Sequence, residues 1–359
     1  MPLGLFLSGG VDSSAIAMTA AARSPASLQA FTIGFQESTF DERQYAKQMA
    51  EHAGIRYCEE VLTSERAIEL GTSVLGRIDE PSGDPSIIPT YLLSRFTRQH
   101  VTVALSGDGG DELFAGYDPF KALLPASLYA KLMPSPVHKG LRGIVEKMPT
   151  SSSNMSLDFV LKRTLLGLSY PDEMRNPAWL SLLEPALLEQ LFGQALPQDE
   201  LYSEAIELWE QGGNKSVMDK SLEFYGRYFL PDRILSKVDQ ATMMCSLESR
   251  AVFLDNEIVE FCQRLPHRMK FRHGSGKYVL KRALKGMVPE NILNRRKKGF
   301  GIPLTDWLPK LIGPALPSTP VIRDEFARRL FRNHMDGRED QRLALWGILS
   351  LGTYLSNRV

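Results

Sequence analysis

Serines, glycines and an aspartate crowd the stretch SGGVDSS, which directly follows the apolar residues GLFL near the start of the chain. An apolar run, a Ser/Gly turn and an alanine-rich segment predict a strand, a tight turn and a helix. Glycines let backbone N–H groups surround an anion, and the start of a helix adds N–H groups and partial positive charge. Three hydroxyls and one carboxylate are available there, from Ser8, Ser13, Ser14 and Asp12. The pattern favours a phosphate site with a bridging magnesium ion over an ordinary serine-capped turn.

A second glycine turn, LSGDGGDELFAGY at residues 105–117, carries Asp108, Asp111 and Glu112 among its glycines. Acids clustered on a glycine turn are typically either metal ligands or solvated loop residues. Beside a phosphate-type turn in the same sheet, the metal role is the better hypothesis. We therefore expect the second turn to take part in magnesium binding.

Strand-like and helix-like segments alternate through the first third of the chain. Runs rich in apolar and β-branched residues predict strands, and longer helix-forming runs predict helices. The predicted strands are residues 3–7, 28–35, 55–62 and 100–107, and the predicted helices are residues 14–22, 40–54, 67–78 and 89–99, with Asp41 as an N-cap and Gly54 as a stop. Such alternation is typical of an α/β fold, a doubly wound parallel sheet that binds ligands at the carboxyl ends of its strands. Both glycine turns follow a predicted strand.

From Tyr117 onward the sequence is mostly helical in character. Pro/Ser-rich stretches such as MPSPVHKG and MPTSSSNMS separate helix-forming runs such as LYSEAIELWEQ. We expect a nucleotide-binding α/β core at residues 1–120 and a mostly helical extension at residues 121–359 that completes the site. The boundary is predicted to fall between Tyr117 and Ser156.

The 359 residues are balanced in charge, with 42 basic and 42 acidic side chains. A protein whose main ligand is a nucleic acid usually carries excess basic charge, so that class is disfavoured. The densest basic run, Arg295-Arg296-Lys297-Lys298, suits a small polyphosphate equally well. The chain has no Cys-x-x-Cys pair, no signal-like start and no long apolar run, and its cysteines are Cys58, Cys245 and Cys262. These features predict a cytoplasmic protein that binds no membrane.

The stretch SGGVDS resembles the signature loop of the ATP pyrophosphatases (the PP-loop group), enzymes that split ATP into AMP and pyrophosphate while adenylating a substrate. The rest of the chain resembles the synthetase half of the glutamine-dependent asparagine synthetases. The matching stretches follow the family's order and cover most of the chain: LSGGVDSS, FTIGFQESTFDERQYAKQMAE, DEPSGDPSIIPTYLLSR, LSGDGGDELFAGY, LPDRILSKVDQATMMCSLESRAVFLD, GKYVLKRALKGMVPENIL and RKKGFGIPLTDWL.

The resemblance implies a role for individual residues at matching positions. The adenosine pocket would be lined by Leu7 and Ile33, and the nucleotide would also be contacted by Ser106 and Gly107. Pyrophosphate would be bound by Ser8, Gly9, Gly10, Asp12 and Ser13. Magnesium would be held by Asp12 and Asp111. Lys277 matches the family's active-site lysine, which would neutralise charge on the α-phosphate and the leaving group. Asp108 stands where the family has an acid linked to amide formation.

The resemblance also implies the reaction, its cofactors ATP and Mg²⁺, and its partners. The β-carboxylate of aspartate would attack the α-phosphorus of ATP, and ammonia would convert the adenylate into asparagine and AMP. The family's full enzymes begin with a glutaminase domain bearing a terminal cysteine nucleophile. This chain starts Met1-Pro2 and has no cysteine before Cys58, so we expect the glutaminase domain to be absent and the chain to be truncated. Free ammonia or a separate glutaminase subunit is the alternative, and a homodimer stays open.

The sequence departs from the family at Ser249, where relatives often have Val or Gly. It also departs at Ala251-Val252, where relatives have Val-Pro before Phe-Leu-Asp, so the proline is missing, and in PDRILSKVDQATMM. These positions flank the expected acceptor site, so they bear on the acceptor more than on the ATP chemistry. The alternatives are an amide- or β-lactam-forming relative acting on another carboxylate, an RNA-modifying pyrophosphatase, and an inactive remnant. The RNA alternative predicts a basic face and often a reactive cysteine pair, neither of which is evident.

Overall fold

The computed structural model describes residues 2–24, 27–149, 151, 153–297, 299–313, 316, 317 and 319–358. The chain forms two compact units. The α/β unit comprises Met1–Leu70, Ser86–Lys121 and Tyr225–Ile302, and the helical unit comprises Gly71–Pro85, Ala122–Phe224 and Pro303–Val359. This division differs from the single domain boundary expected near residue 120, because the third segment of the α/β unit comes from the second half of the chain.

The α/β unit contains a five-stranded, all-parallel sheet in the order β3-β2-β1-β4-β5, as the alternating pattern predicts. Its strands are β1 (Leu3–Phe6), β2 (Leu28–Phe35), β3 (Arg56–Leu62), β4 (Val103–Ser106) and β5 (Glu248–Ala251). Its helices are α1 (Val11–Ala21), α2 (Arg43–Ala53), α4 (Ile87–Arg98), α5 (Gly110–Phe114), η2 (Tyr225–Leu235, a π-helix), α14 (Ser236–Met243), η3 (Val252–Leu254, a 3₁₀-helix), α15 (Asn256–Arg264), α16 (His267–Lys270), α17 (Tyr278–Ala283) and α18 (Glu290–Leu293). The short, polar strand β5 is absent from the sequence prediction.

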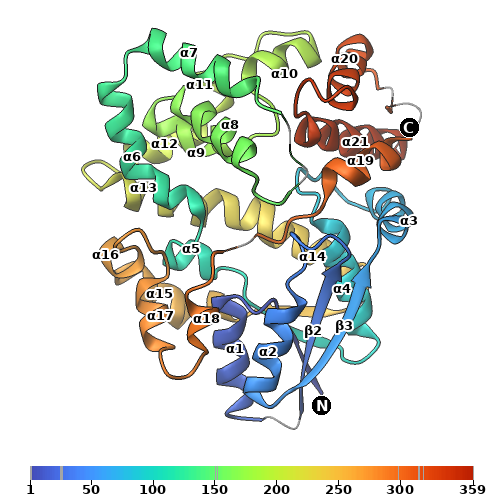
Figure 1. The fold of residues 1–359 in the computed structure, drawn as a ribbon, viewed down its shortest axis with the longest axis vertical. Helices are drawn as coiled ribbons and strands as arrows, with labels where there is room; N and C mark the ends of the chain where they lie inside the picture. Colours follow the sequence, from blue (N-terminus) through green and yellow to red (C-terminus); the bar gives the residue numbers. More distant parts are fainter. Residues whose placement is uncertain are drawn as a thin grey trace. The chain divides into compact units, whose positions relative to one another are not determined.

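Helices cover the sheet in two groups. Helices α1 and α2 pack against each other and against β2, whereas α4 packs with α14 and also contacts β2 (Figure 1). Nearly every residue of β2 is buried, as expected for a strand covered on both faces. Helix α2 ends at Gly54, which has a φ of 66° and is the predicted stop. Its N-cap is Glu42, one residue after the predicted Asp41, whose carboxylate instead accepts a hydrogen bond from the Arg43 N–H (3.2 Å).

The strand order reverses between β1 and β4. The chain leaves β1 for β2 and then β3, and later returns to place β4 on the other side of β1. In parallel sheets the crevice at such a reversal, at the carboxyl ends of the strands, is the usual ligand site. The two glycine turns leave the sheet at this point, because one follows β1 and the other follows β4.

The helical unit contains only helices and connections among the residues that are described. They are α7 (Ser135–Glu146), α8 (Leu157–Leu168), α9 (Asp172–Leu180), α10 (Pro185–Phe192), α11 (Gln198–Leu201), α12 (Ser203–Gln211), α13 (Val217–Phe224), α19 (Leu304–Ile312), α20 (Asp324–Met335) and α21 (Arg342–Ser356). Helices α3 (Ser64–Leu75) and α6 (Asp118–Leu132) contain residues of both units. Within the described ranges, no helix combines the length and apolar character needed to cross a membrane.

Two methionines on helices of the α/β unit give a matched test of this core. Met49 of α2 is fully buried, whereas Met243 of α14 is 61% exposed. We expect Met49→Ala to lower the free energy of unfolding by about 2–5 kcal/mol, because it leaves a cavity in the core. Met243→Ala should change it by less than about 0.5 kcal/mol. Urea unfolding followed by circular dichroism measures both, and equal effects would contradict the described packing.

Candidate active site

The turn between β1 and α1 is closed by its own serines. The Ser8 N–H donates to Ser13 Oγ (3.3 Å), the Gly10 N–H donates to Ser8 Oγ (3.3 Å), and Ser13 Oγ donates to Gly10 O (3.3 Å). Gly9 has a φ of 65°, and a Cβ there would lie 2.4 Å from the backbone carbon of Tyr45. The turn therefore requires glycine at this position, and the serine hydroxyls in this structure maintain its shape.

The second turn, between β4 and α5, packs directly on Asp12 of the first. A Cβ on Gly110 would lie 2.7 Å from Asp12 Cγ, so only glycine permits this approach. The same turn brings Asp111 to the start of α5, next to Asp12. Two carboxylates from different turns are thereby held close together.

Two lysines neutralise these carboxylates. Lys277 is only 7% exposed. Its Nζ donates a hydrogen bond to Asp12 Oδ2 and lies 2.6 Å from Asp111 Oδ1. Lys297 pairs with Asp111 Oδ2, and its Nζ lies 4.3 Å from the ring centroid of Tyr117. The result is a compact group of two negative and two positive charges, hereafter the Asp–Lys group.

The backbone fixes where Lys277 lies. This residue precedes α17 in the left-handed conformation (φ 57°), and its N–H donates to the carbonyl oxygen of Phe114 at the end of α5 (2.7 Å). The start of α17 is therefore attached to the helix that carries Asp111.

Burial and charge act against each other in the Asp–Lys group. Burial opposes ionisation of Asp111, but Lys277 and Lys297 outweigh it, so the pKa of Asp111 is lowered. Burial dominates at Asp12 and raises the pKa of that carboxyl. The pKa of Lys277 is raised, because Asp111 and Asp12 outweigh the burial that opposes its charge. The lysine therefore stays protonated.

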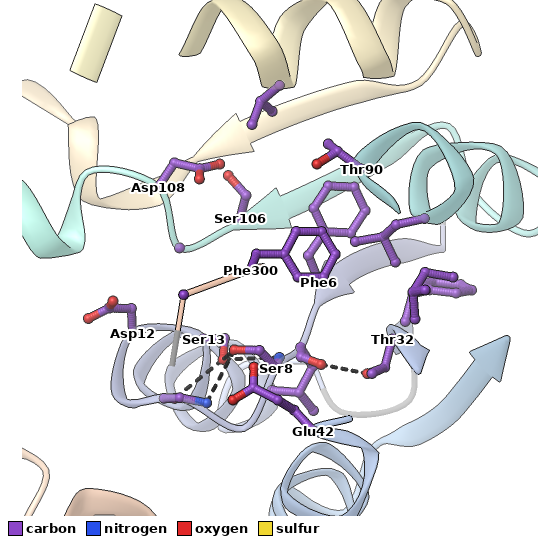
Figure 2. A pocket seen from close by; sticks show the side chains of 18 of the residues that line it. Phe6, Ser8, Asp12, Ser13, Thr32, Glu42, Thr90, Ser106, Asp108 and Phe300 are labelled. Atoms are coloured by element: carbon purple, nitrogen blue, oxygen red, sulfur yellow. Dashed lines mark hydrogen bonds between the residues drawn. The ribbon is translucent and has the colours of Figure 1, made fainter. Parts of the chain in front are cut away.

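A cavity of about 250 Å³ opens beside the two turns, within the α/β unit. Its apolar lining comes from Phe6, Leu7, Phe31, Ile33, Phe35, Phe40, Leu93, Val238 and Phe300. Its polar lining includes Ser8, Asp12, Ser13, Glu42, Thr90, Ser106, Asp108, Asp111 and Lys237. Figure 2 shows Ser106 and Asp108 across the pocket from Ser8 and Ser13. One part of the cavity thus suits a flat apolar ring, and the other suits a charged group.

Lys237 and Asp108 bring an opposite pair of charges to the cavity. Lys237 is 8% exposed and donates to Ser86 Oγ (3.0 Å). Burial raises the pKa of Asp108, and the Lys237 charge opposes that rise. A carboxyl group with a raised pKa accepts a proton more readily than an ordinary aspartate.

Most residues that the sequence singles out converge here. The cavity is lined by Leu7, Ser8, Gly10, Asp12, Ser13, Ile33, Ser106, Gly107, Asp108 and Asp111. Gly9 belongs to the same turn but packs against α2, and Lys277 reaches the site through Asp12 and Asp111. Their individual roles stay predictions.

Apart from the observation that the basic run suits a small polyphosphate, the sequence assigned no role here to Lys237, Phe300, Arg295 or Lys297. The last two belong to the basic run, which was the available signal; Lys298 of that run lies outside the described residues.

The donors fit a magnesium ion. Asp12 Oδ1 is buried and accepts no hydrogen bond from any described residue. Within the described part of the chain, no group of three or more His, Cys, Asp or Glu residues could hold a metal. Two carboxylates without further protein ligands suit Mg²⁺, which usually takes its remaining ligands from phosphate oxygens and water.

The chain is similar to known proteins of one family. The family model described as asparagine synthase matches residues 1–356. The chain is 30% identical, over 97% of its length and 55% of the relative's, to asparagine synthetase [glutamine-hydrolyzing] 1 of Bacillus subtilis. It is 32% identical to a putative asparagine synthetase of Mycobacterium bovis, over 85% of this chain and 46% of the relative, and 23% identical to amidase chyE of Penicillium rubens, over 86% and 50%. The chain spans about half the length of these relatives.

Removing the charge of Asp111 tests the Asp–Lys group. We expect Asp111→Asn to lower the free energy of unfolding by about 3–5 kcal/mol, because two lysines are left with one carboxylate. Asp118 is the matched control: it pairs with the exposed Lys121 (2.6 Å), and Asp118→Asn should cost less than about 1 kcal/mol. Urea unfolding without ligand measures both. A gain in stability from Asp111→Asn would contradict the described charge balance.

Glu112 provides a test by pH. It is 4% exposed, accepts a hydrogen bond from Tyr117 Oη (2.5 Å), and burial raises the pKa of its carboxyl to about 7. In the folded protein Glu112 keeps its proton up to about pH 7, whereas in the unfolded chain it releases the proton at lower pH. The contribution of protonated Glu112 to the free energy of unfolding is therefore lost as the pH rises to about 7. Between about pH 5 and pH 8, wild type should lose about 2–3 kcal/mol relative to Glu112→Gln.

The control for this measurement is Glu260→Gln, which alters a surface carboxylate paired with Arg264 (3.2 Å). Its unfolding free energy should follow that of the wild type at every pH. Parallel pH profiles for wild type and Glu112→Gln would show that Glu112 titrates normally.

Proposed function

Since the chain belongs to the asparagine synthase family, we propose that it is an ATP-dependent ligase that joins ammonia to a carboxylate through an acyl adenylate. The observation that carries the proposal is a single cavity whose apolar walls adjoin a serine–glycine turn and the Asp–Lys group. An adenine ring suits the first part and a triphosphate suits the second. The preferred acceptor is the β-carboxylate of aspartate, which gives asparagine.

In this proposal the adenosine lies against Leu7 and Ile33, with Ser106 and Gly107 beside it. The phosphates lie at the first turn, where the start of α1 adds backbone N–H groups and partial positive charge. Ser8 and Ser13 would exchange part of their hydrogen bonds within the turn for bonds to phosphate oxygens.

The first chemical step is adenylation. A carboxylate oxygen of the acceptor attacks the α-phosphorus, a new P–O bond forms, and the bond to the bridging oxygen breaks so that pyrophosphate leaves. Lys277 would stabilise the negative charge that moves onto the leaving group, because its ammonium is fixed before the reaction begins. Asp12 and Asp111 would hold Mg²⁺, which when bound neutralises the phosphate oxygens.

The second step forms the amide. The nitrogen of ammonia attacks the acyl carbon, the bond from that carbon to the AMP oxygen breaks, and AMP leaves. The nitrogen must lose a proton. Asp108 is the proposed proton acceptor, because burial raises the pKa of its carboxyl group. Lys237, which also lines the cavity and interacts electrostatically with Asp108, would balance the carboxylate charge of the acceptor substrate.

A second candidate keeps this chemistry and changes the acceptor. Ser249 and Ala251, where the chain departs from the family pattern, lie on β5 and pair in register with Ala104 and Ser106 of β4. Ser106 lines the cavity, so the departures adjoin the proposed acceptor end. The similarity to a fungal protein named an amidase also fits another carboxylate substrate.

The cytoplasm is the proposed location of the protein.

Pyrophosphate release from Mg-ATP tests the proposal, in the presence of ammonia and a panel of carboxylates. We expect release to require aspartate and to match AMP and asparagine in amount. Lys277→Ala should reduce the rate about 10²–10³-fold, because it removes a positioned cation. The control Lys285→Ala alters an exposed lysine of the same region and should leave the rate unchanged.

Release that requires a different carboxylate would replace aspartate with that acceptor. A folded wild-type protein that binds ATP but releases no pyrophosphate with any acceptor would contradict the proposed reaction. An unaltered rate in Lys277→Ala would contradict the role of that lysine.

A further inference from the structure

Arg295 contacts the first turn from a distant part of the sequence. It follows α18, and its side chain is only 9% exposed. One guanidinium nitrogen donates to the carbonyl oxygens of Gly9 (3.0 Å) and Ser8 (3.4 Å). A single side chain therefore holds two successive carbonyl groups of the turn.

The same guanidinium is held by α2. Its other terminal nitrogen pairs with Glu42, whose side chain is 12% exposed, and its central carbon lies 4.3 Å from the ring centroid of Tyr45. In Figure 2, Glu42 lies beside Ser8 and Ser13. Gly9 also packs against the backbone of Tyr45. The Ser8–Gly10 loop, the arginine side chain and the start of α2 are therefore in mutual contact.

This contact decides where the amides of the turn point. In a trans peptide the C=O and the next residue's N–H point in opposite directions. With the carbonyls of Ser8 and Gly9 held by Arg295, the N–H groups of Gly9 and Gly10 are directed away from the arginine. The Gly10 N–H indeed donates to Ser8 Oγ, which belongs to a residue that lines the cavity.

We propose that Arg295 is a positioning residue that orients the amides of the Ser8–Gly10 turn for the phosphates of a nucleoside triphosphate. The ligand in this statement rests on the proposed function, whereas the orientation of the turn does not. A lysine cannot replace the arginine, because one ammonium lacks the planar fork that reaches the two carbonyls, Glu42 and the tyrosine ring together.

Hydrogen exchange and ligand binding test the proposal in the full chain. In Arg295→Ala and Arg295→Lys, amides of a peptide covering residues 8–14 should exchange faster, while peptides from the rest of the sheet are unchanged. Affinity for Mg-ATP should fall about 10–100-fold in Arg295→Ala, as expected for lost hydrogen bonds to a charged group, whereas affinity for adenosine stays within about twofold. Millimolar guanidinium should restore part of the ATP affinity.

Arg296→Ala is the matched control, because Arg296 is the exposed neighbour in the same run. It should change neither exchange nor affinity, and guanidinium should not affect it. If Arg295→Ala fails to fold, Arg295→Lys decides, since it keeps a positive charge beside Glu42.

Two results would overturn the inference: unchanged exchange at residues 8–14, or an unchanged ratio of ATP to adenosine affinity, which includes an equal loss of both. If the wild type binds no ATP, the proposed function fails instead, and the exchange measurement still decides whether Arg295 orients the turn.

Discussion

The ammonium group of Lys277 lies between the carboxylates of Asp12 and Asp111, which come from turns that follow two different strands. Two largely buried carboxylates this close would repel each other, so without the lysines the pKa of at least one of them would be strongly raised. A buried lysine without partners would lose its proton, because burial disfavours its charged form. Each charge is therefore stable only because the others are present, and the shape of the site depends on this mutual compensation.

Several features of the fold maintain the contact of Lys277 with the two carboxylates. The reversal of strand order places the ends of β1 and β4 side by side. Gly110 lets the second turn approach Asp12, and the bond from the Lys277 N–H to Phe114 O sets the start of α17. A larger residue at Gly110 or an unattached α17 would separate the charges. The electrostatics of the site thus depend on close backbone packing more than on the number of charged residues.

In the proposed reaction this group of charges would receive a polyanion. The two lysines balance the two aspartates in the ligand-free protein, so the group as a whole is neutral. A polyphosphate brought in with magnesium would add negative and positive charge together, and the lysines could turn from the carboxylates to the phosphates. Arg295 takes no part in this balance, because its partners are Glu42 and backbone carbonyls. Charge compensation and turn geometry are therefore supplied by different residues.

Local patterns in the sequence determined the strand–turn–helix units, the helix stop at Gly54 and the residue types of both glycine turns, because such features depend on neighbours within a few positions. The resemblance to a family added Lys277. The tertiary structure alone decided the order of the strands, the addition of the polar strand β5, and the contact of Arg295 with Ser8, 287 positions away. No pattern of a few residues encodes these, because pairing between distant segments is chosen by the packing of the whole unit.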